Sequence, residues 1–134
     1  MKFLMGRRIL LSVVIMLLAG NLSFSQGEII NDIKDAIKTG SSKEIARFLN
    51  QSVDVTLDGN MQSYSKTQAE YVLKDFFKNK PPSSFTIVHQ GASKGGLPYA
   101  IGQYISKGET YRVWVRIKNT GSQYLIHEIS FIKE

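Results

Sequence analysis

The C-terminal half of the chain contains four segments in which apolar and polar residues alternate, and three short glycine-containing loops separate these segments. The loops are Lys94-Gly95-Gly96, Ser106-Lys107-Gly108 and Asn119-Thr120-Gly121. Alternation with a period of two is typical of β-strands, and the last position of a three-residue hairpin loop favours glycine because its backbone is left-handed. We therefore expect residues 83–134 to form four antiparallel strands.

The loop lengths determine how these strands pair, and the pairing determines which side chains share a face. Three-residue loops predict the following opposed pairs: Ser93 with Leu97, Ile105 with Glu109, and Lys118 with Ser122. The face expected to pack against helices then carries Phe85, Ile87, His89, Gly91, Tyr99, Ile101, Gln103, Ile105, Tyr111, Val113, Val115, Ile117, Leu125, His127, Ile129 and Phe131. The opposite, outer face carries Thr86, Val88, Gln90, Ala100, Gly102, Tyr104, Arg112, Trp114, Arg116, Tyr124, Ile126 and Glu128.

The position of Glu128 distinguishes between two possible lengths of the last loop, at residues 119–121. A two-residue turn at Thr120-Gly121 would place Glu128 opposite Val113 on the apolar face. Burying that carboxylate unpaired would cost several kcal/mol, so the three-residue loop is preferred. Under this register Arg112 lies directly opposite Glu128 on the outer face.

Two helices are expected before the first strand. Residues Glu28–Thr39 have apolar side chains at helical spacing, and Gly40 follows them as a common C-terminal stop. Ser41 and Glu44 form a capping box, which predicts the start of a short second helix.

A hairpin and a third helix follow. Val53–Leu57 alternates with a period of two, and Asp58-Gly59-Asn60 predicts a turn into a second strand that ends at Tyr64. Ser65-Lys66-Thr67-Gln68 is a second capping box, and the helix behind it is expected to end before Pro81-Pro82. The apolar stripes of the helices are expected to cover the apolar face of the sheet.

The first 25 residues have the pattern of a cleaved export signal. Three basic residues lie within the first eight positions, and Ile9–Gly20 is an apolar run of 12 residues. Ser23-Phe24-Ser25 supplies small residues where a signal peptidase reads them, which predicts cleavage before Gln26. The run is shorter than the roughly 20 residues of a spanning helix, although an uncleaved anchor is the alternative. We expect residues 26–134 to form a single exported α+β domain, periplasmic or extracellular.

Composition excludes several classes of function. The chain has no cysteine, which excludes disulfides, a cysteine-ligated zinc site, a thiol nucleophile and a lipid-anchored cysteine. Its 17 basic and 11 acidic residues give a net charge of +6, and loss of residues 1–25 leaves 14 basic and 11 acidic residues, or +3. Such a weak charge is not typical of a nucleic-acid-binding domain. No cofactor or metal motif is present, so neither is predicted.

The order of helices, hairpin, helix and four long strands resembles the nuclear-transport-factor-2-like or cystatin-like superfamily. Tyr64-Ser65-Lys66-Thr67-Gln68-Ala69, Val88-His89-Gln90-Gly91 and Tyr124-Leu125-Ile126-His127-Glu128 look like segments of an uncharacterised family of small exported bacterial proteins. The resemblance implies an α+β fold with a strongly curved, mostly antiparallel sheet, which the early hairpin extends. It implies no particular function, because the superfamily holds isomerases, dehydratases, transport adaptors and non-catalytic domains.

Five polar residues on the expected inner face are candidates for ligand binding: His89, Tyr99, Gln103, Tyr111 and His127. The predicted register puts both histidines in one row, three strand spacings or roughly 14 Å apart, which is too far for a shared metal ion. Gln103 is expected opposite Tyr111. These residues are either satisfied members of the core or the few polar groups that orient a ligand in an apolar cavity.

An aromatic and cationic stripe is expected on the outer face, and it consists of Tyr104, Arg112, Trp114, Arg116 and Tyr124. One interpretation is a solvated sheet face held by cross-strand pairs. The other is a docking surface for a protein or glycan, because tryptophan, tyrosine and arginine dominate interface hot spots.

We therefore expect a non-catalytic envelope domain that binds a small apolar ligand or a protein partner. The alternative is an isomerase- or dehydratase-like enzyme, with His89 or His127 as base and Tyr99 or Tyr111 as proton donor. The resembling isomerases need an inward carboxylate, and here only Glu109, next to a turn, is expected to face inward from the last four strands. A homodimer formed through paired sheet faces is a third alternative.

Overall fold

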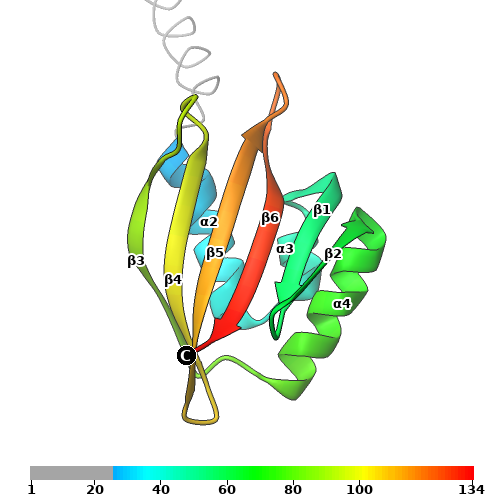
Figure 1. Ribbon diagram of the computed structural model, residues 1–134, viewed down its shortest axis with the longest axis vertical. Coiled ribbons are helices and arrows are strands. Elements are labelled where there is room, and N and C mark those ends of the chain that lie inside the picture. The colour runs from blue at the N-terminus through cyan, green and yellow to red at the C-terminus, as the bar shows by residue number, and fades with distance from the viewer. Residues whose placement is uncertain (1–25) are drawn as a thin grey trace, which may run out of the picture.

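The computed structural model describes residues 26–134, which form three helices and six strands, arranged as in Figure 1. Their order is α2 (Gln26–Thr39), α3 (Ser42–Ala46), β1 (Leu49–Leu57), β2 (Asn60–Ser65), α4 (Lys66–Asn79), β3 (Ser84–Ala92), β4 (Pro98–Ser106), β5 (Glu109–Asn119) and β6 (Tyr124–Lys133). The expected export signal lies outside the described residues. Within residues 26–134, no helix is long and apolar enough to cross a membrane.

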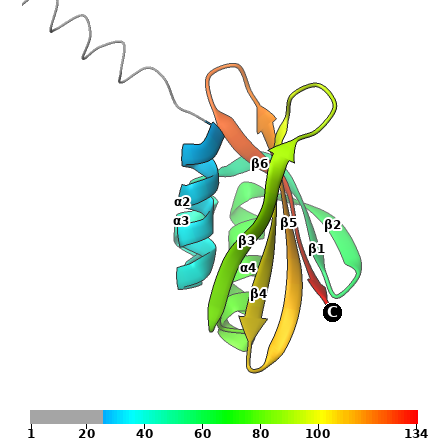
Figure 2. The same ribbon diagram turned by 90° about the vertical axis from the view of Figure 1, so that its left-hand side faces the viewer.

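All six strands form one curved sheet in the order β2-β1-β6-β5-β4-β3. Strands β1 and β6 run parallel, and every other neighbouring pair is antiparallel. The helices lie on one face of the sheet, as Figures 1 and 2 show. The predicted α+β architecture is confirmed, and so is the early hairpin that extends the sheet.

Local capping signals determine where the helices begin. The Ser65 hydroxyl accepts from the Gln68 backbone N–H at 3.2 Å, and the Gln68 side chain accepts from the Ser65 N–H at 3.1 Å, which completes the predicted capping box of α4. At α3 the Ser41 hydroxyl accepts from the Glu44 N–H at 3.1 Å, while the Glu44 carboxylate pairs with Arg47 instead of closing the box.

An aromatic cluster fills the space between α4 and the sheet. It consists of Phe76, Phe77, Tyr104, Tyr111 and Phe131, whose ring centroids lie between 4.5 and 6.3 Å apart. Edge-to-face and tilted contacts at these separations are favourable for aromatic pairs. Four of the five side chains are at most 5% exposed and Phe76 is partly buried, so this part of the inner face is packed with the protein's own side chains.

The β4–β5 loop is one residue shorter than predicted. Ser106 pairs with Glu109, so only Lys107 and Gly108 form the turn, and both have positive φ, 51° and 78°. Two successive residues with positive φ make a type I′ turn, which matches the twist of a hairpin. The predicted pairing of Ile105 with Glu109 is therefore wrong, and β4 is shifted by one residue against β5.

This shift exchanges the two faces of β4, because successive side chains point to opposite sides. Ala100, Gly102 and Tyr104 are buried on the helix side. The predicted inner residues of this strand lie instead on the outer face: Tyr99, Ile101, Gln103 and Ile105. Strand β5 follows the prediction, since Val113 and Val115 are buried and Trp114 is not.

Strand β6 carries a bulge that the sequence analysis did not include. The preceding loop spans four residues, 120–123, and Asn119 pairs with Tyr124, so the predicted pairing of Lys118 with Ser122 is wrong. Arg116 pairs with Glu128 and Ile117 with Ile126, which leaves His127 as an extra residue between them.

The bulge changes which residues of β6 meet the core. Ile126 is fully buried and Tyr124 packs against the core, although both were expected on the outer face. Leu125 and His127 are only half-buried. Because the strand is displaced, Arg112 lies opposite Ile132 rather than Glu128.

Strand β3 has a second bulge, at Val88. Phe85 and Ile87 face the helices as predicted, but the register shifts before His89. The predicted pair of His89 with Ile101 is confirmed, yet both residues lie on the outer face because β4 is inverted. The three-residue β3–β4 loop is also confirmed, since the Ser93 N–H donates to the Leu97 carbonyl at 2.8 Å.

Candidate functional site

Within the described chain, no helix or loop covers the face of the sheet opposite the helices, as Figure 2 shows. Its central strands, β4 and β5, present a group that we call the outer patch, which consists of Tyr99, Ile101, Arg112, Trp114 and Arg116. The register places Tyr99 directly opposite Arg116, and Ile101 opposite Trp114. These side chains are therefore neighbours on adjacent strands.

Trp114, at the centre of the outer patch, contacts Tyr99 on the neighbouring strand and Arg116 on its own strand. The Tyr99 and Trp114 rings are nearly parallel, with an interplanar angle of 23° and centroids 6.5 Å apart. The Arg116 guanidinium carbon lies 5.1 Å from the centroid of the Trp114 ring. Such a cation–π contact at an exposed site contributes about 0.5–1 kcal/mol. These contacts restrict the rotamers of Trp114.

Polar contacts hold the neighbours of Trp114 in place. The Arg116 Nε lies 2.7 Å from the Glu128 carboxylate. His89 Nε2 and the Tyr99 hydroxyl share a hydrogen bond of 2.9 Å. The ordered group therefore extends over four strands, from β3 to β6.

The charges of the outer patch are paired. Arg116 pairs with Glu128, and the Arg112 Nε lies 2.9 Å from the Glu134 carboxylate. Ion pairs at half-exposed positions contribute little to stability, typically 0–1 kcal/mol. Their main effect here is to leave the patch close to neutral around its aromatic centre.

Apolar side chains extend the patch. Ile132, opposite Arg112, is 43% exposed, and Ile101 and Ile105 are only half-buried. The outer face thus combines aromatic rings, exposed aliphatic side chains and paired charges. The centre of a protein interface has this composition.

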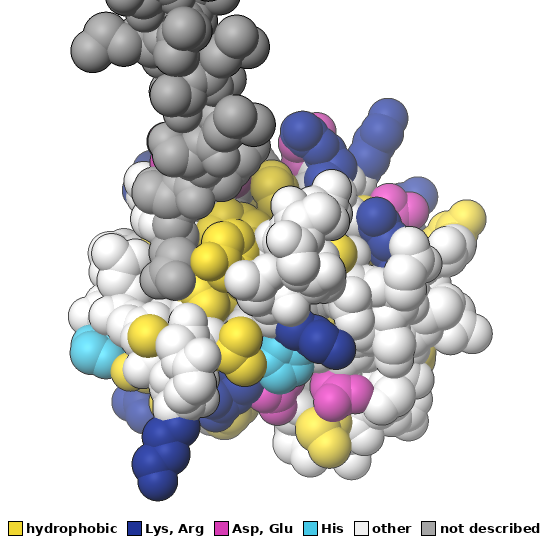
Figure 3. Space-filling model, turned by 90° about the horizontal axis from the view of Figure 1, so that it is seen from above, with side chains coloured by type: hydrophobic (Ala, Val, Ile, Leu, Met, Phe, Trp, Pro, Cys, Tyr) yellow, Lys and Arg dark blue, Asp and Glu magenta, His cyan; other side chains and the backbone are white. Residues whose placement is uncertain are grey.

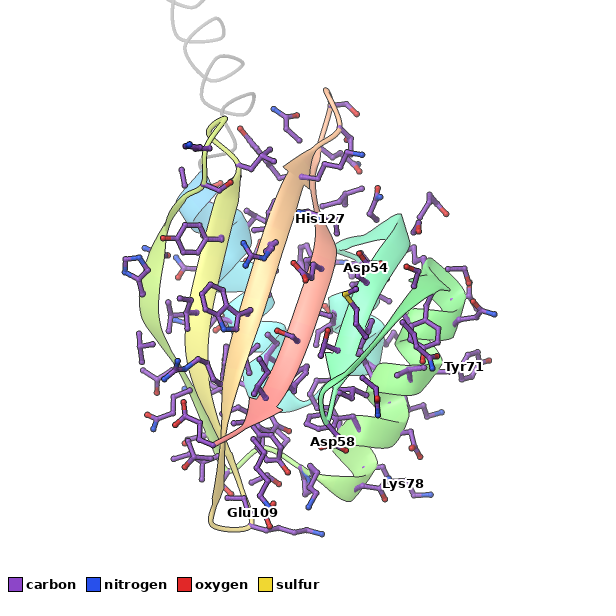
Figure 4. The ribbon with its side chains drawn as sticks, in the orientation of Figure 1. Asp54, Asp58, Tyr71, Lys78, Glu109 and His127 are labelled. Carbon is purple, nitrogen blue, oxygen red and sulfur yellow. The ribbon has the colours of Figure 1, made fainter. Side chains whose placement is uncertain are left out.

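A separate polar cluster surrounds Glu109 at the end of the β4–β5 hairpin, which Figure 4 shows far from His127. Its carboxylate accepts from the Tyr111 hydroxyl at 3.1 Å and from the ammonium groups of Lys80 and Lys133, each at 3.3 Å. These three hydrogen bonds hold the pKa of Glu109 below its usual range, and the bond to Glu109 raises the pKa of Lys80. A carboxylate held ionised in this way is a weak base, and a general base needs a pKa near the working pH.

Two tyrosines tie this cluster to the core. Burial, together with neighbouring Tyr111, raises the pKa of Tyr104, and burial followed by the bond to Glu109 raises the pKa of Tyr111. The Tyr104 hydroxyl donates to the backbone carbonyl of Lys80, which joins β4 to the segment after α4. Both phenols therefore remain protonated and act as structural donors.

The five predicted ligand-binding residues do not form one site. His89, Tyr99 and Gln103 lie on the outer face or at its edge, Tyr111 lies on the helix side, and His127 lies at the bulge of β6. Gln103 faces Arg112, not Tyr111 as predicted, because β4 is shifted. Figure 3 shows the two histidines well separated on the surface. Among residues 26–134, no group of three or more histidine or acidic side chains could hold a metal ion.

The predicted partner-binding stripe divides into two groups. The outer placement of Arg112, Trp114 and Arg116 is confirmed, and their role in binding stays a prediction. Tyr104 is fully buried on the helix side and Tyr124 packs against the core, so both placements are wrong. Tyr99 and Ile101 were not predicted on the outer face, because their placement depends on the length of the β4–β5 turn. Ile132 of β6 was also not predicted there, and its place opposite Arg112 follows from the register between β5 and β6.

Comparisons with solved structures identify relatives. A DUF4783 family protein from Bacteroides ovatus is 28% identical to this chain, with a TM-score of 0.73 over 77% of this chain and 93% of the other. A second, from Bacteroides uniformis, is 27% identical, with a TM-score of 0.73 over 78% and 95%. An NTF-2-like protein of unknown function from Silicibacter pomeroyi is 10% identical, with a TM-score of 0.58 over 83% and 100%, a similarity of fold alone.

No curated protein sequence matches the chain significantly. Residues 30–131 match the family described as Domain of unknown function (DUF4783), which covers most of the chain. The resemblance to small proteins with a nuclear-transport-factor-2-like fold is thereby confirmed. The chain belongs to the DUF4783 family.

Proposed function

We propose that the protein is an exported, non-catalytic domain that binds a protein partner through the outer patch. The observation that carries this proposal is the Trp114 side chain, ordered by Tyr99 and Arg116 on a sheet face that no other part of residues 26–134 covers. Export rests on the signal pattern of residues 1–25.

The outer patch has the features of an interface hot spot. Tryptophan, tyrosine and arginine are the residues most enriched at hot spots, and side chains already held in one rotamer lose less entropy on binding. Arg116 and Arg112 have their own carboxylate partners, so a protein that covers Trp114 meets no unpaired cation there. The exposed Ile132 and half-buried Ile101 add apolar area, which favours a protein surface over the hydroxyl-rich surface of a glycan.

The small-ligand and enzyme alternatives have less support. The aromatic cluster fills the inner face of the sheet beside α4, and the cleft of about 550 Å³ next to it contains only one of the five predicted ligand-binding residues, Tyr111. His89 and His127, the proposed bases, lie at the edge of the outer face and at the β6 bulge. Glu109 is occupied by three donors.

A quantitative binding experiment tests the proposal. Immobilised protein would be exposed to envelope extract of the source organism, and each retained protein would be purified and titrated against wild type and Trp114→Ala. A central hot spot predicts a loss of about 2 kcal/mol or more, roughly a 30-fold rise in Kd. Lys74→Ala, on the exposed side of α4, serves as the control and should leave the Kd unchanged.

Three results would contradict the proposal. A Kd unaffected by Trp114→Ala would move the interface away from the outer patch. Binding of purified glycans that Trp114→Ala abolishes would replace the protein partner with a sugar. A sedimentation experiment in which wild type is dimeric and Trp114→Ala monomeric would replace the envelope partner with a second copy of the chain.

A further inference from the structure

A groove of about 620 Å³ lies between α2 and β3, at the edge of the sheet. Asn31, Lys34 and Lys38 of α2 form one wall, and residues 85–90 of β3 form the other. Figure 2 shows α2 beside β3 and running in the opposite direction. The groove is distinct from the outer patch, although His89 borders both.

The β3 wall of the groove is an edge strand. Within the described chain, β3 pairs with β4 alone and is the last strand of the sheet. In an antiparallel strand about half of the backbone N–H and C=O groups point away from the paired neighbour. An edge strand therefore offers a template on which a further strand can pair. Phe85 and Ile87 give this wall an apolar component.

The α2 wall is positively charged. At 100° per residue, Asn31, Lys34 and Lys38 fall within about 60° of arc around the helix. Asp35 lies about 40° and Asp32 about 100° beyond Asn31 on the side away from Lys34, and no acidic residue lines the groove. Among the described residues, neither Lys34 nor Lys38 forms an ion pair. The groove thus combines open backbone groups with unpaired ammonium groups.

We propose that this groove binds a short acidic peptide of another protein, in an extended conformation, as an added strand beside β3. The peptide backbone would pair with the open side of β3. The acidic side chains of the peptide that point to the helix face of the sheet would meet Lys34 and Lys38, whose positive charge is complementary to them. The bulge at Val88 interrupts regular pairing, so the paired stretch is short, and a long, flat strand of a second copy fits poorly.

A titration followed by backbone amide NMR shifts tests this inference. The probe is an N-acetylated, C-amidated pentapeptide that alternates glutamate and valine, starting with glutamate. The expected result is saturable shifts of amides in residues 85–90 and near Lys34. A peptide with lysine in place of glutamate, and one with proline in place of both valines, should bind at least about tenfold more weakly, because the first reverses the charge and the second removes backbone donors at unchanged charge.

Matched charge reversals separate the groove from the net charge of the protein. The variant Lys34→Glu with Lys38→Glu should raise the Kd at least about tenfold. The control, Lys74→Glu with Lys78→Glu, changes two exposed lysines with the same spacing on another 14-residue helix and should leave the Kd within about twofold. If the groove variant folds poorly, Lys34→Gln with Lys38→Gln should also raise the Kd of the peptide, by a smaller factor, because it removes the two charges without reversing them.

Several outcomes would overturn the inference. These are the absence of shifts in β3, an equal loss of binding in both double variants, or a lysine or proline peptide that binds as tightly as the glutamate–valine peptide. The result is independent of the outer patch, since Trp114→Ala should leave peptide binding at the groove unchanged. If Trp114→Ala loses the protein partner but still binds the peptide, the outer patch and the groove are two independent binding sites.

Discussion

Among the glycines of the described residues, Gly102 has the least room for an added side chain. It lies on β4 and faces the helices, and a Cβ built there would sit 2.4 Å from Cε1 and from Cζ of the Phe85 ring and 3.1 Å from the Thr86 carbonyl oxygen. Phe85 is only 4% exposed, so its ring has little room to move. Overpacking of this kind costs about 1–3 kcal/mol. For a domain of this size, Gly102→Ala should lower the Tm by roughly 4–12 °C.

The measurement is urea and thermal unfolding of Gly102→Ala, combined with a rescue variant. Phe85→Leu removes the two ring atoms that the new Cβ would meet, so the double variant should lose about 1 kcal/mol less than the sum of the single losses. Gly91→Ala on β3 is the matched control, because its Cβ would meet only the outer end of the half-buried Tyr99 side chain, whose hydroxyl lies 3.1 Å away. It should stay within about 0.5 kcal/mol of wild type. Full stability of Gly102→Ala, or strictly additive losses, would refute the packing argument.

Three further predictions concern the caps and the polar cluster. Ser65→Ala should cost about 1 kcal/mol in urea unfolding, because the Gln68 N–H loses its acceptor, and an unchanged midpoint would contradict this. Tyr104→Phe should cost about 1–3 kcal/mol, because the Lys80 carbonyl loses a buried donor, and calorimetry checks the Tm. The pKa of Glu109 is lowered by folding, so its stabilisation is present above the usual carboxyl range and is lost as the pH falls through the lowered pKa. Glu109→Gln should therefore flatten the acid side of the stability–pH curve, and an unaltered curve would show that the carboxylate is not linked to folding.

Features that depend on neighbouring residues in the chain could be predicted from the sequence. The capping box at Ser65 and Gln68 is made by residues three apart, so no tertiary contact is needed to form it. The alternation in β5 is regular over its whole length, which is why Arg112, Trp114 and Arg116 lie on the outer face as predicted. The order of the elements follows from the same local patterns.

The bulges depend on strands that are distant in the sequence. His127 is an extra residue in the pairing of β6 with β5, and β6 also pairs with the parallel strand β1, which is distant in the sequence. One signal was present, since the buried Ile126 and Ile129 are three residues apart, and an odd spacing cannot keep both on one face of a regular strand. Strand β3 offers no comparable signal, because Phe85 and Ile87 before Val88 keep the regular spacing.

The composition of the outer patch depends on one turn. Ser106-Lys107-Gly108 fits a three-residue loop with glycine last, and it equally fits a two-residue turn in which Lys107 also takes a positive φ. The second choice places a non-glycine residue at positive φ, and the packing of Tyr104 and Gly102 against the core favours it together with the hairpin twist. The inversion of β4 then places Tyr99 beside Trp114 on the outer face. The position of Trp114 on that face follows from the alternation of β5 and does not depend on β4. A local turn that the sequence leaves ambiguous therefore decides whether the tryptophan has an aromatic neighbour, and the proposed binding surface depends on that neighbour.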